Sequence, residues 1–352
     1  MSVSRVARFQ IEFRPYRRKF RQSHITARGE WSAREGVIVR LTDPDGHMGY
    51  GEAAPIPGFT VETTAADSAW LRRAGSKVTL AEIARIPARL PCLRWAVACA
   101  QAMLAGAFTP PRRARTLPVA SLLPAGTAAR AVLKRQIASG YRVCKWKIAT
   151  LPVAAELRLF DQLLEALPVG AKLRLDANGG LNAHDFAAWL AHLRALGRDA
   201  RMVEFLEQPF PPARSAAAWA AQRRQAANLC IPIALDESVS GLPALRRATR
   251  WPGPLVVKPS LLGDLAGFLR WRGRADLVYS SAFETSVGLH SALWLAATDP
   301  RAGERALGFG TLAAFADDGL QLPLHAPAPF LKFSPLTAND FAEIWNRLPP
   351  SA

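Results

Sequence analysis

The sequence predicts an α/β fold in which a (β/α) barrel is joined to an N-terminal α+β capping domain. Two observations indicate this arrangement. After Leu117, short apolar runs alternate with alanine-rich amphipathic runs about every 30 residues, a pattern typical of parallel strands covered by helices. Before residue 115 the expected strands come first and the helices follow. A doubly wound open sheet is the alternative for the second part, but no GxGxxG motif follows its first strand.

The first part, residues 1–115, begins with three expected strands that form an antiparallel meander. The first alternates in polarity, and the turn sequence Asp43-Pro44-Asp45-Gly46 separates the second from the third. Helices are expected in the alanine- and leucine-rich stretch that follows. The strands are expected at 3–13, 36–42 and 47–52, the helices within 61–107 and a linker at 110–115. We expect the C-terminal residues 315–352 to complete this domain.

The second part, residues 116–314, contains seven clear strand–helix units and a weak eighth strand. A chain of 352 residues that is 50% hydrophobic is long enough for such a barrel beside a smaller domain. The expected strands are 119–122, 142–147, 172–176, 202–207, 231–235, 255–258, 277–281 and, as the eighth, 307–310. The expected helices are 127–139, 152–166, 182–196, 212–228, 241–249, 263–271 and 286–297.

The composition argues against several classes of protein. The chain has no apolar run long enough for a membrane span, and Met1 to Phe20 lacks the apolar core of a secretory signal, so we expect a cytoplasmic protein. None of the four cysteines is in a CxxC pair, and we expect buried thiols. The formal net charge of +17 comes mostly from scattered arginines without a nucleic-acid-binding motif. We interpret them as a solvated surface whose positive field also helps an anionic substrate to reach its site.

Carboxylates stand at the ends of three consecutive barrel strands: Asp176, Glu207 and Asp236. The carboxyl ends of barrel strands converge on the face where active sites are found. Charged groups are costly to bury there unless they are paired or bind a metal. Carboxylate oxygens are the hard ligands that Mg²⁺ prefers, and Mn²⁺ accepts them as well. The sequence therefore predicts a site for Mg²⁺ (or Mn²⁺) built from these three residues.

Three of the eight lysines in the chain also end barrel strands: Lys145 and Lys147 in the second and Lys258 in the sixth. Residues i and i+2 of a strand share a face, so Lys145 and Lys147 point the same way while Trp146 points into the helix layer. Neighbouring ammonium groups disfavour each other's protonation. A lysine at this place should therefore have a lowered pKa and could act as a base.

The set KxK, DAN, EQP, DES and KPS, in this order and at these intervals, resembles the enolase superfamily in its muconate-lactonising subgroup. The resemblance spans the barrel and the two-domain layout, and it implies a modified TIM barrel. It implies that Lys147 is the base on one face of the substrate and Lys258 the lysine opposite, with Lys145 as a helper that lowers the pKa of Lys147. It also implies that Asp176, Glu207 and Asp236 bind one Mg²⁺.

Two further stretches resemble the o-succinylbenzoate synthases of that superfamily: residues 49–59 and the sequence SSAFETSVG at 280–288. This resemblance implies dehydration of 2-succinyl-6-hydroxy-2,4-cyclohexadiene-1-carboxylate for menaquinone or phylloquinone synthesis. Glu284 also has a simpler interpretation, as a cap for the helix that follows. The residues that the resemblance assigns to substrate binding are Arg174, Asn178, Ser281, Glu284, Gly58 and Phe59.

Other functions remain as alternatives. An N-acylamino acid racemase, a dipeptide epimerase or a muconate-type cycloisomerase would use the same lysines and carboxylates. Dipeptide epimerases usually carry an aspartate pair after the eighth strand for the substrate amine, and the stretch 308–311 has no carboxylate. A non-catalytic protein that binds anions or nucleic acid is a minor alternative that rests on the net charge alone. We expect a small-molecule carboxylate as the partner, with no nucleic acid and no membrane; the sequence does not decide between a monomer and a homo-oligomer.

Overall fold

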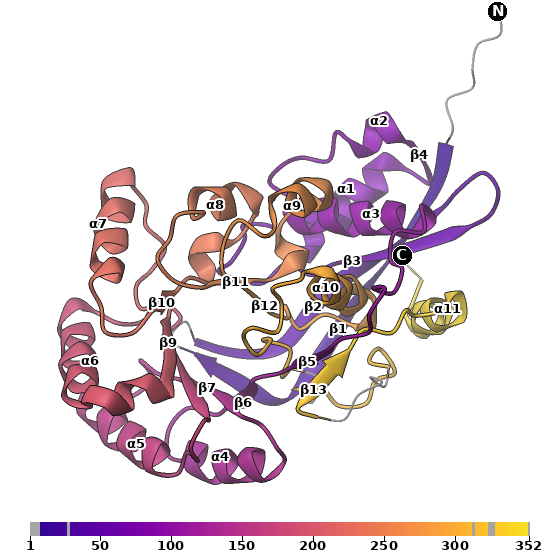
Figure 1. The fold of residues 1–352 in the computed structure, drawn as a ribbon. Coiled ribbons are helices and arrows are strands. Elements are labelled where there is room, and N and C mark those ends of the chain that lie inside the picture. Colours follow the sequence, from indigo (N-terminus) through magenta and orange to yellow (C-terminus); the bar gives the residue numbers. More distant parts are fainter. Residues whose placement is uncertain (1–7, 27–28, 312–313, 323–327, 351–352) are drawn as a thin grey trace, which may run out of the picture.

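The structure, a computed structural model, describes residues 8–26, 29–311, 314–322 and 328–350 (Figure 1). An N-terminal β-rich domain packs beside a C-terminal α/β domain whose strands form a barrel. The predicted fold class is therefore confirmed. Among the described residues, none of the helices has the length and apolarity needed to cross a membrane.

The N-terminal sheet is antiparallel and has the strand order β3-β2-β1-β4. Its hairpin of β1 and β2 is much longer than the sequence suggested. The polar–apolar alternation of this hairpin is hidden because Arg18 and Arg34 are buried at inward-facing positions. The strands are β1 (Arg8–Thr26), β2 (Gly29–Thr42), β3 (Met48–Ala53) and β4 (Lys77–Thr79), of which β4 was not predicted.

Three helices cover the N-terminal sheet, as expected for residues 61–107. The third, α3, packs against β3 and β2. Glycines in β3 make this close packing possible, because a Cβ atom at Gly49 or Gly51 would collide with the backbone carbonyl of Ala100 or Ala96. The helices are α1 (Thr64–Ala74), α2 (Leu80–Ile83) and α3 (Pro91–Leu104).

The barrel consists of a five-stranded parallel sheet and a parallel pair, which isolated bridges join into a ring. Leu235 bridges to Leu255, and Gly308 and Leu307 bridge to Ser280 and Val119, so the eighth position is filled by a bridging segment rather than a regular strand. The strands are β6 (Ser121–Leu123), β7 (Val143–Lys147), β8 (Lys172–Asp176), β9 (Val203–Glu207), β10 (Ile233–Ala234), β11 (Leu255–Val257) and β12 (Leu277–Tyr279). Each of the seven overlaps a predicted strand.

A helix follows each of the seven strands, and Figure 1 shows several of these helices along the outer side of the barrel. The rings of Trp146, Phe160 and Trp189 pack together between strand and helix layers, which confirms the outward direction of Trp146. The helices, all predicted, are α4 (Ala128–Ala138), α5 (Val153–Glu165), α6 (Ala183–Ala195), α7 (Ala216–Ala227), α8 (Leu242–Arg247), α9 (Leu265–Trp271) and α10 (Ser286–Thr298).

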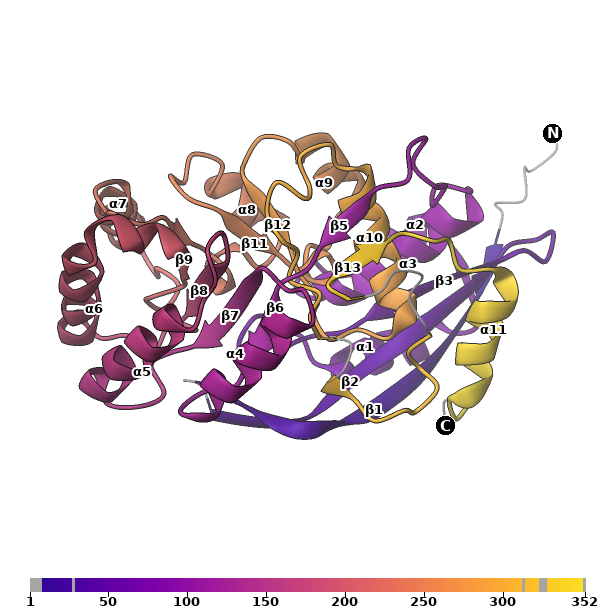
Figure 2. The same cartoon turned by 60° about the horizontal axis from the view of Figure 1, so that its bottom comes forward.

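The C-terminal segment contacts both parts. Strand β13 (Phe330–Lys332) pairs with β5 (Thr116–Pro118), and helix α11 (Ala338–Arg347) packs on the N-terminal sheet through aromatic rings. The ring of Tyr50 lies 5.3 Å from that of Phe341, centroid to centroid. Figure 2 shows α11 beside the end of this sheet. The division at residue 115, with 315–352 completing the first domain, stays a prediction.

Candidate active site

A cavity of about 350 Å³ lies at the carboxyl ends of the barrel strands. Both domains form its wall. The barrel contributes lysines, carboxylates and apolar side chains from its strand ends, while the N-terminal domain contributes residues from the β1–β2 hairpin and from the loop after β3. The residues from the N-terminal domain are Glu30, Trp31, Ile56, Pro57 and Phe59.

The predicted lysines and carboxylates meet in this cavity. The ammonium of Lys145 lies 2.7 Å from Asp176 Oδ2 and 2.6 Å from Glu207 Oε1, so it bridges two neighbouring strands. Lys147 donates to Asp176 Oδ2 at 2.6 Å and to Asn178 Oδ1 at 2.5 Å. On the other side of the barrel, Lys258 pairs with Asp236. With 24% of its side chain exposed, against 13% for Lys145, Lys147 is the lysine of the KxK pair that is more open to the cavity.

Lys147 and Lys258 face each other because of the strand order. Lys147 ends β7, the second strand of the ring, and Lys258 follows β11, the sixth. These two strands are four positions apart in a closed ring of eight, so they lie on opposite sides of the cavity. The two ammonium groups can therefore approach a flat ligand from its two faces.

The electrostatics correct one expectation. Burial alone would lower the pKa of Lys145, but the carboxylates of Asp176, Glu207 and Asp236 outweigh it and raise this pKa above its ordinary value. The prediction of a lowered pKa is therefore wrong for Lys145, because its nearest neighbours are anions rather than the other lysine. Its ammonium stays charged and holds the ends of β8 and β9 together.

The lysines affect the pKa values of the carboxylates to different extents. Burial raises the pKa of Asp176, but Lys145 and Lys147 outweigh burial and bring it below its ordinary value. Burial, with the nearby Asp176, raises the pKa of Glu207 to about 7. Burial and the neighbouring carboxylates therefore disfavour a charged Glu207, and a divalent cation among these hard oxygen ligands would favour its charged form. Asp176, Glu207 and Asp236 thus have the chemistry of a Mg²⁺ site.

A second cluster of acidic residues is more compact, but its compactness has another cause than metal binding. Ligand atoms of Asp43, Asp45 and His47 lie within 4.8 Å of one another, and this is the only such group of three among the residues that the structure describes. It sits on the exposed turn between β2 and β3, where Asp43 Oδ1 accepts the N–H groups of Asp45 and His47. These hydrogen bonds explain its compactness. The oxygens of the strand-end carboxylates are instead spaced by the lysines between them.

Backbone strain marks the same strand ends. In the described chain, four residues other than glycine have a positive φ, and each either lines the cavity or follows a cavity-lining residue by one or two positions. Such conformations cost free energy in side-chain-bearing residues and gather at functional sites. The four are Ala149 after Lys147, Asn178, which lines the cavity itself, Gln208 after Glu207 and Phe283 after Ser281.

Two residues that the sequence did not single out hold this face together. Gln208 is buried, and its Oε1 accepts the backbone N–H groups of Asp236 and Ser238 at 3.0 and 3.1 Å. Glu237 accepts a hydrogen bond from Asn178 Nδ2 at 3.1 Å. Both residues stand next to a predicted carboxylate, in the EQP and DES motifs. This position was the only signal in the sequence for their role. Their partners come from other strands and are invisible in the sequence.

Of the six residues expected to bind substrate, four line the cavity: Phe59, Arg174, Asn178 and Ser281. Arg174 is also tied to the scaffold, with Nε on Glu204 Oε2 and Nη2 on the carbonyl oxygen of Ala306, both at 2.7 Å. The wall traced over the described residues does not include Gly58 or Glu284. Their roles in substrate binding stay predictions.

Glu284 is buried beneath the cavity wall and shapes it indirectly. Its carboxylate accepts hydrogen bonds from Ser260 Oγ at 3.1 Å, Ser281 Oγ at 2.7 Å and the N–H of Ala282 at 2.8 Å. The expected cap of helix α10 is formed instead by Thr285, whose hydroxyl accepts the N–H of Val287. Glu284 therefore fixes the loop that carries Ser281.

Comparison with known proteins identifies the family. Residues 127–301 match the family model described as enolase C-terminal domain-like, and residues 14–104 match the N-terminal domain of MenC. The chain is 36% identical to the o-succinylbenzoate synthase of Thermosynechococcus vestitus over 85% of its own length and 91% of that protein. It is 32% identical to the o-succinylbenzoate synthase of Pectobacterium atrosepticum over 73% of its own length and 76% of that protein.

The chain belongs to the o-succinylbenzoate synthase family of the enolase superfamily.

A solved structure extends the likeness over the whole molecule. The crystal structure of o-succinylbenzoate synthase from Thermosynechococcus elongatus, complexed with Mg in the active site, covers 96% of this chain and all of its own, with a TM-score of 0.77 and 32% identity. An N-succinyl Arg/Lys racemase from Bacillus cereus gives a TM-score of 0.78 at 18% identity, and an L-Ala-D/L-Glu epimerase from Bacillus subtilis gives 0.73 at 20%. At that identity the last two show the fold alone.

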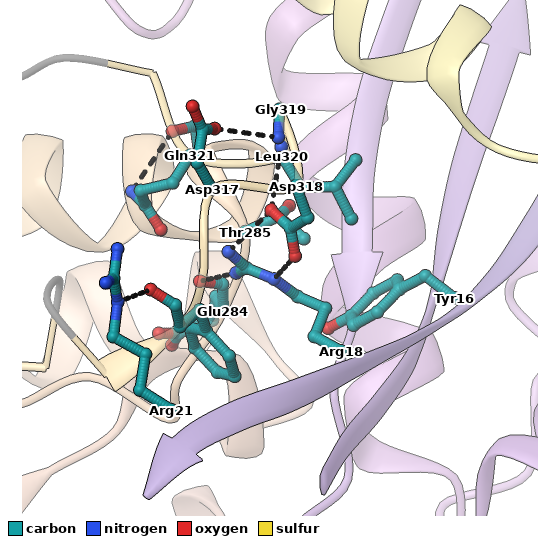
Figure 3. A network of polar contacts seen from close by, with 12 residues as sticks. Tyr16, Arg18, Arg21, Glu284, Thr285, Asp317, Asp318, Gly319, Leu320 and Gln321 are labelled. Carbon is teal, nitrogen blue, oxygen red and sulfur yellow. Dashed lines mark hydrogen bonds and ion pairs between the residues drawn. The ribbon is translucent and has the colours of Figure 1, made fainter.

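The stretch 280–288, which resembles this family in sequence, is held from the N-terminal domain. Figure 3 shows Arg18 of β1 between the carboxylate of Asp318 and the carbonyl oxygen of Glu284, with hydrogen bonds of 2.7 and 3.4 Å. Arg34 of β2 donates to the carbonyl oxygen of Ala282 at 2.9 Å and to that of Pro55 at 2.7 Å. Arg34 therefore connects the loop that carries Ser281 to the loop that carries Phe59, and Arg18 connects the first of these loops to Asp318.

Proposed function

We propose that this protein is an o-succinylbenzoate synthase. It removes water from 2-succinyl-6-hydroxy-2,4-cyclohexadiene-1-carboxylate and releases 2-succinylbenzoate, which serves menaquinone or phylloquinone synthesis. The observation that carries the proposal is the placement of Lys147 and Lys258 on opposite sides of one cavity, beside three buried carboxylates, in a chain of this family. The flat cyclohexadiene ring is proposed to lie between these two groups.

The proposed base is Lys147, which is the more exposed lysine of the KxK pair. In its neutral form it takes the proton from the ring carbon that bears the carboxylate. The electron pair of that C–H bond first delocalises onto the carboxylate oxygens and then forms the new ring double bond as the C–O bond on the next carbon breaks. The departing hydroxide takes the proton back from Lys147 and leaves as water, so the lysine ends neutral and the ring is aromatic.

Lys258 is proposed to act as a fixed positive charge on the opposite face. Abstraction of a proton next to a carboxylate places negative charge on the carboxylate oxygens, and a preorganised ammonium stabilises that charge without reorienting. Lys145 keeps Asp176 and Glu207 in place through its two ion pairs. Asn178 is proposed to orient Lys147, because its Oδ1 accepts from the lysine while its amide group is held by Glu237.

Asp176, Glu207 and Asp236 are the proposed ligands of Mg²⁺, with Mn²⁺ as a substitute of similar ligand preference. When bound there, the ion would supply positive charge to the substrate carboxylate as the adjacent proton leaves. The burial of Glu207 beside the carboxylates of Asp176 and Asp236 supports this assignment.

The substrate tail is proposed to lie under the N-terminal domain. Phe59, Ser281 and Arg174 line the cavity and are proposed to contact this tail. Gly58 and Glu284 are proposed to contribute by shaping the loops that carry Phe59 and Ser281. We further propose a cytoplasmic enzyme that works on a small-molecule carboxylate, without a nucleic-acid or membrane partner.

A racemase, epimerase or cycloisomerase of the same superfamily is the second candidate, because it would use the same two lysines for acid–base chemistry. The segment at the eighth barrel position, Gly308 to Thr311, lacks a carboxylate for a substrate amine. That observation favours dehydration over dipeptide epimerisation.

The test is a spectrophotometric dehydration assay with the cyclohexadiene carboxylate, with and without Mg²⁺. We expect loss of diene absorbance that requires the metal and that Lys147→Ala reduces by at least about 10³-fold, since it removes the base. Lys134→Ala, an exposed lysine on α4, is the matched control and should keep full activity. Metal-dependent exchange of the α-proton of N-succinylamino acids without dehydration would favour the racemase instead.

A further inference from the structure

The loop after β3 turns sharply to bring one aromatic ring into the cavity. The N–H of Phe59 donates to the carbonyl oxygen of Ile56 at 3.1 Å, which closes a four-residue turn. Pro57 and Gly58 are its central residues, and Gly58 has a φ of +82°. Proline followed by a residue with positive φ is the signature of a type II turn, in which glycine is favoured at the third position. The sequence Ile-Pro-Gly-Phe therefore fixes where the side chain of Phe59 emerges.

The ring of Phe59 contacts the charged ammonium group of Lys258. The ammonium nitrogen of Lys258 lies 4.4 Å from the centroid of this ring. A cation this close to an aromatic face is attracted by the negative potential of the π-system, and the attraction strengthens when water is excluded. Only 10% of the Lys258 side chain is exposed, so the contact is largely shielded from water.

Lys258 thus has partners from both domains. Asp236, from the barrel, pairs with its ammonium, and Phe59, from the N-terminal domain, covers it from another side. Lys145 and Lys147, by contrast, have their described partners on neighbouring barrel strands. The contact with Phe59 therefore joins the N-terminal domain to a lysine of the barrel.

We infer that Phe59 is a positioning residue for Lys258: its π-face holds the ammonium in place over the substrate, in addition to walling the cavity. The inference rests on the proposed function, in which Lys258 acts as a fixed charge. It assigns the N-terminal domain a part in the chemical step, whereas a wall would affect only substrate fit.

These two roles predict different responses. A wall depends on the shape and volume of the side chain, and its alteration changes KM. A π-face on a cation depends on the electron density of the ring, and its weakening lowers kcat because Lys258 loses its fixed position. Fluorination of the ring removes π-density with little change of size, so it separates the two.

The experiment uses the full chain with Mg²⁺ and measures kcat and KM for dehydration. Phe59 is replaced by mono-, di- and trifluorophenylalanine through codon suppression, and by Leu and Tyr. We expect log kcat to fall stepwise with each fluorine, by about 2- to 30-fold in all, with a smaller change in KM. F59Y should retain more of kcat than F59L. The same fluorinated series at Phe186, whose ring packs on Phe210 away from the cavity, should leave kcat unchanged.

A second measurement does not depend on activity. The chain has only eight lysines, so ¹³C-labelled lysine side chains can be resolved by NMR and Lys258 assigned by its loss in K258R. Ring current from Phe59 should shift the Lys258 Cε protons upfield, and F59L should abolish that shift. A kcat that is flat across the fluorinated series, or a Lys258 signal that F59L leaves in place, would overturn the inference. A wild-type protein that shows the ring-current shift but no dehydration would overturn the proposed function instead.

Discussion

Glu52, on strand β3 of the N-terminal domain, caps the barrel helix α10 at Thr285, 233 residues further along the chain. Its carboxylate accepts the N–H groups of Thr285 at 3.0 Å and Gly288 at 2.9 Å, and the hydroxyl of Tyr16 donates to it at 2.5 Å. The first N–H groups of a helix have no partner within the helix, and a negative charge there is favourable. One domain therefore completes a helix of the other, directly beside the loop that shapes the cavity.

We expect Glu52→Ala to lower the free energy of unfolding by about 3 kcal/mol, because it leaves buried N–H donors without an acceptor. Glu52→Gln, which keeps an acceptor but loses the charge, should cost about 1–2 kcal/mol. Urea unfolding followed by circular dichroism measures both. Glu343→Gln is the matched control: its carboxylate pairs with Arg347 on the exposed face of α11 and should cost at most about 0.5 kcal/mol. Equal stability of E52A and E343Q would contradict the capping role.

Mg²⁺ should raise the melting temperature of the protein through the strand-end carboxylates. Binding to the folded state alone stabilises it by about 2.7 kcal/mol when the ion is present at 100 times its dissociation constant. Asp176→Asn should remove most of this increase, because it takes a charged ligand from the proposed site. Asp43→Asn alters the compact acidic turn and should leave the increase intact. The reverse result in differential scanning fluorimetry would assign the ion to the turn.

The sequence predicted the site where strand periodicity and βα alternation determine position. Lys145, Lys147 and Asp176 were placed together because i and i+2 share a face and the carboxyl ends of barrel strands converge. The direction of the Lys145 pKa was wrong, because the sequence does not show that the nearest groups to its ammonium are Asp176 and Glu207.

Contacts between distant segments could not be predicted. In the sequence, Arg18 is one of several charges in a basic strand. Its ion pair with Asp318, 300 residues away, forms only in the folded chain. The contact of Phe59 with Lys258 needs the packing of two domains. The eighth strand was expected at 307–310 as a regular element, but its pairing is reduced to isolated bridges at Leu307 and Gly308.

Lowering the pH should destabilise the protein through His290. Burial among the rings of Phe108, Phe333 and Phe341 lowers the pKa of this histidine to about 4. An unfolded histidine titrates near 6.5. The unfolded state therefore binds a proton first, and the stability that is fully present above pH 6.5 is lost as the pH falls toward 4.

The expected loss from this group is about 2 kcal/mol between pH 6.5 and pH 5. His290→Phe should remove that part of the pH dependence, as measured by urea unfolding at the two pH values. His184→Gln, at an exposed histidine on α6, should leave it unchanged. A wild-type protein and an H290F variant with parallel stability–pH curves would show that the histidine does not stay neutral in the fold.

Raising the pH should also destabilise the protein, in this case through Asp67. Burial, together with the neighbouring carboxylate of Glu62, raises the pKa of this carboxyl to about 10. Glu62 is itself occupied at the start of α3, where it accepts the N–H groups of Cys92 and Leu93 at 2.6 and 2.9 Å. Asp67 is therefore protonated in the folded protein at neutral pH, whereas in the unfolded chain it ionises near pH 3.9.

Stability from a carboxyl of this kind is fully present below pH 3.9 and is lost as the pH rises toward 10. Asp67→Asn replaces a protonated carboxyl by a neutral amide of similar shape and removes that loss. We expect D67N to be more stable than the wild type at pH 7, with a difference that grows by up to about 1.4 kcal/mol per pH unit between pH 5 and pH 8. The difference between Asp45→Asn, at an exposed carboxyl, and the wild type should stay flat. If D67N were less stable than the wild type at every pH, Asp67 would have to be ionised in the fold, with its charge balanced by a nearby group.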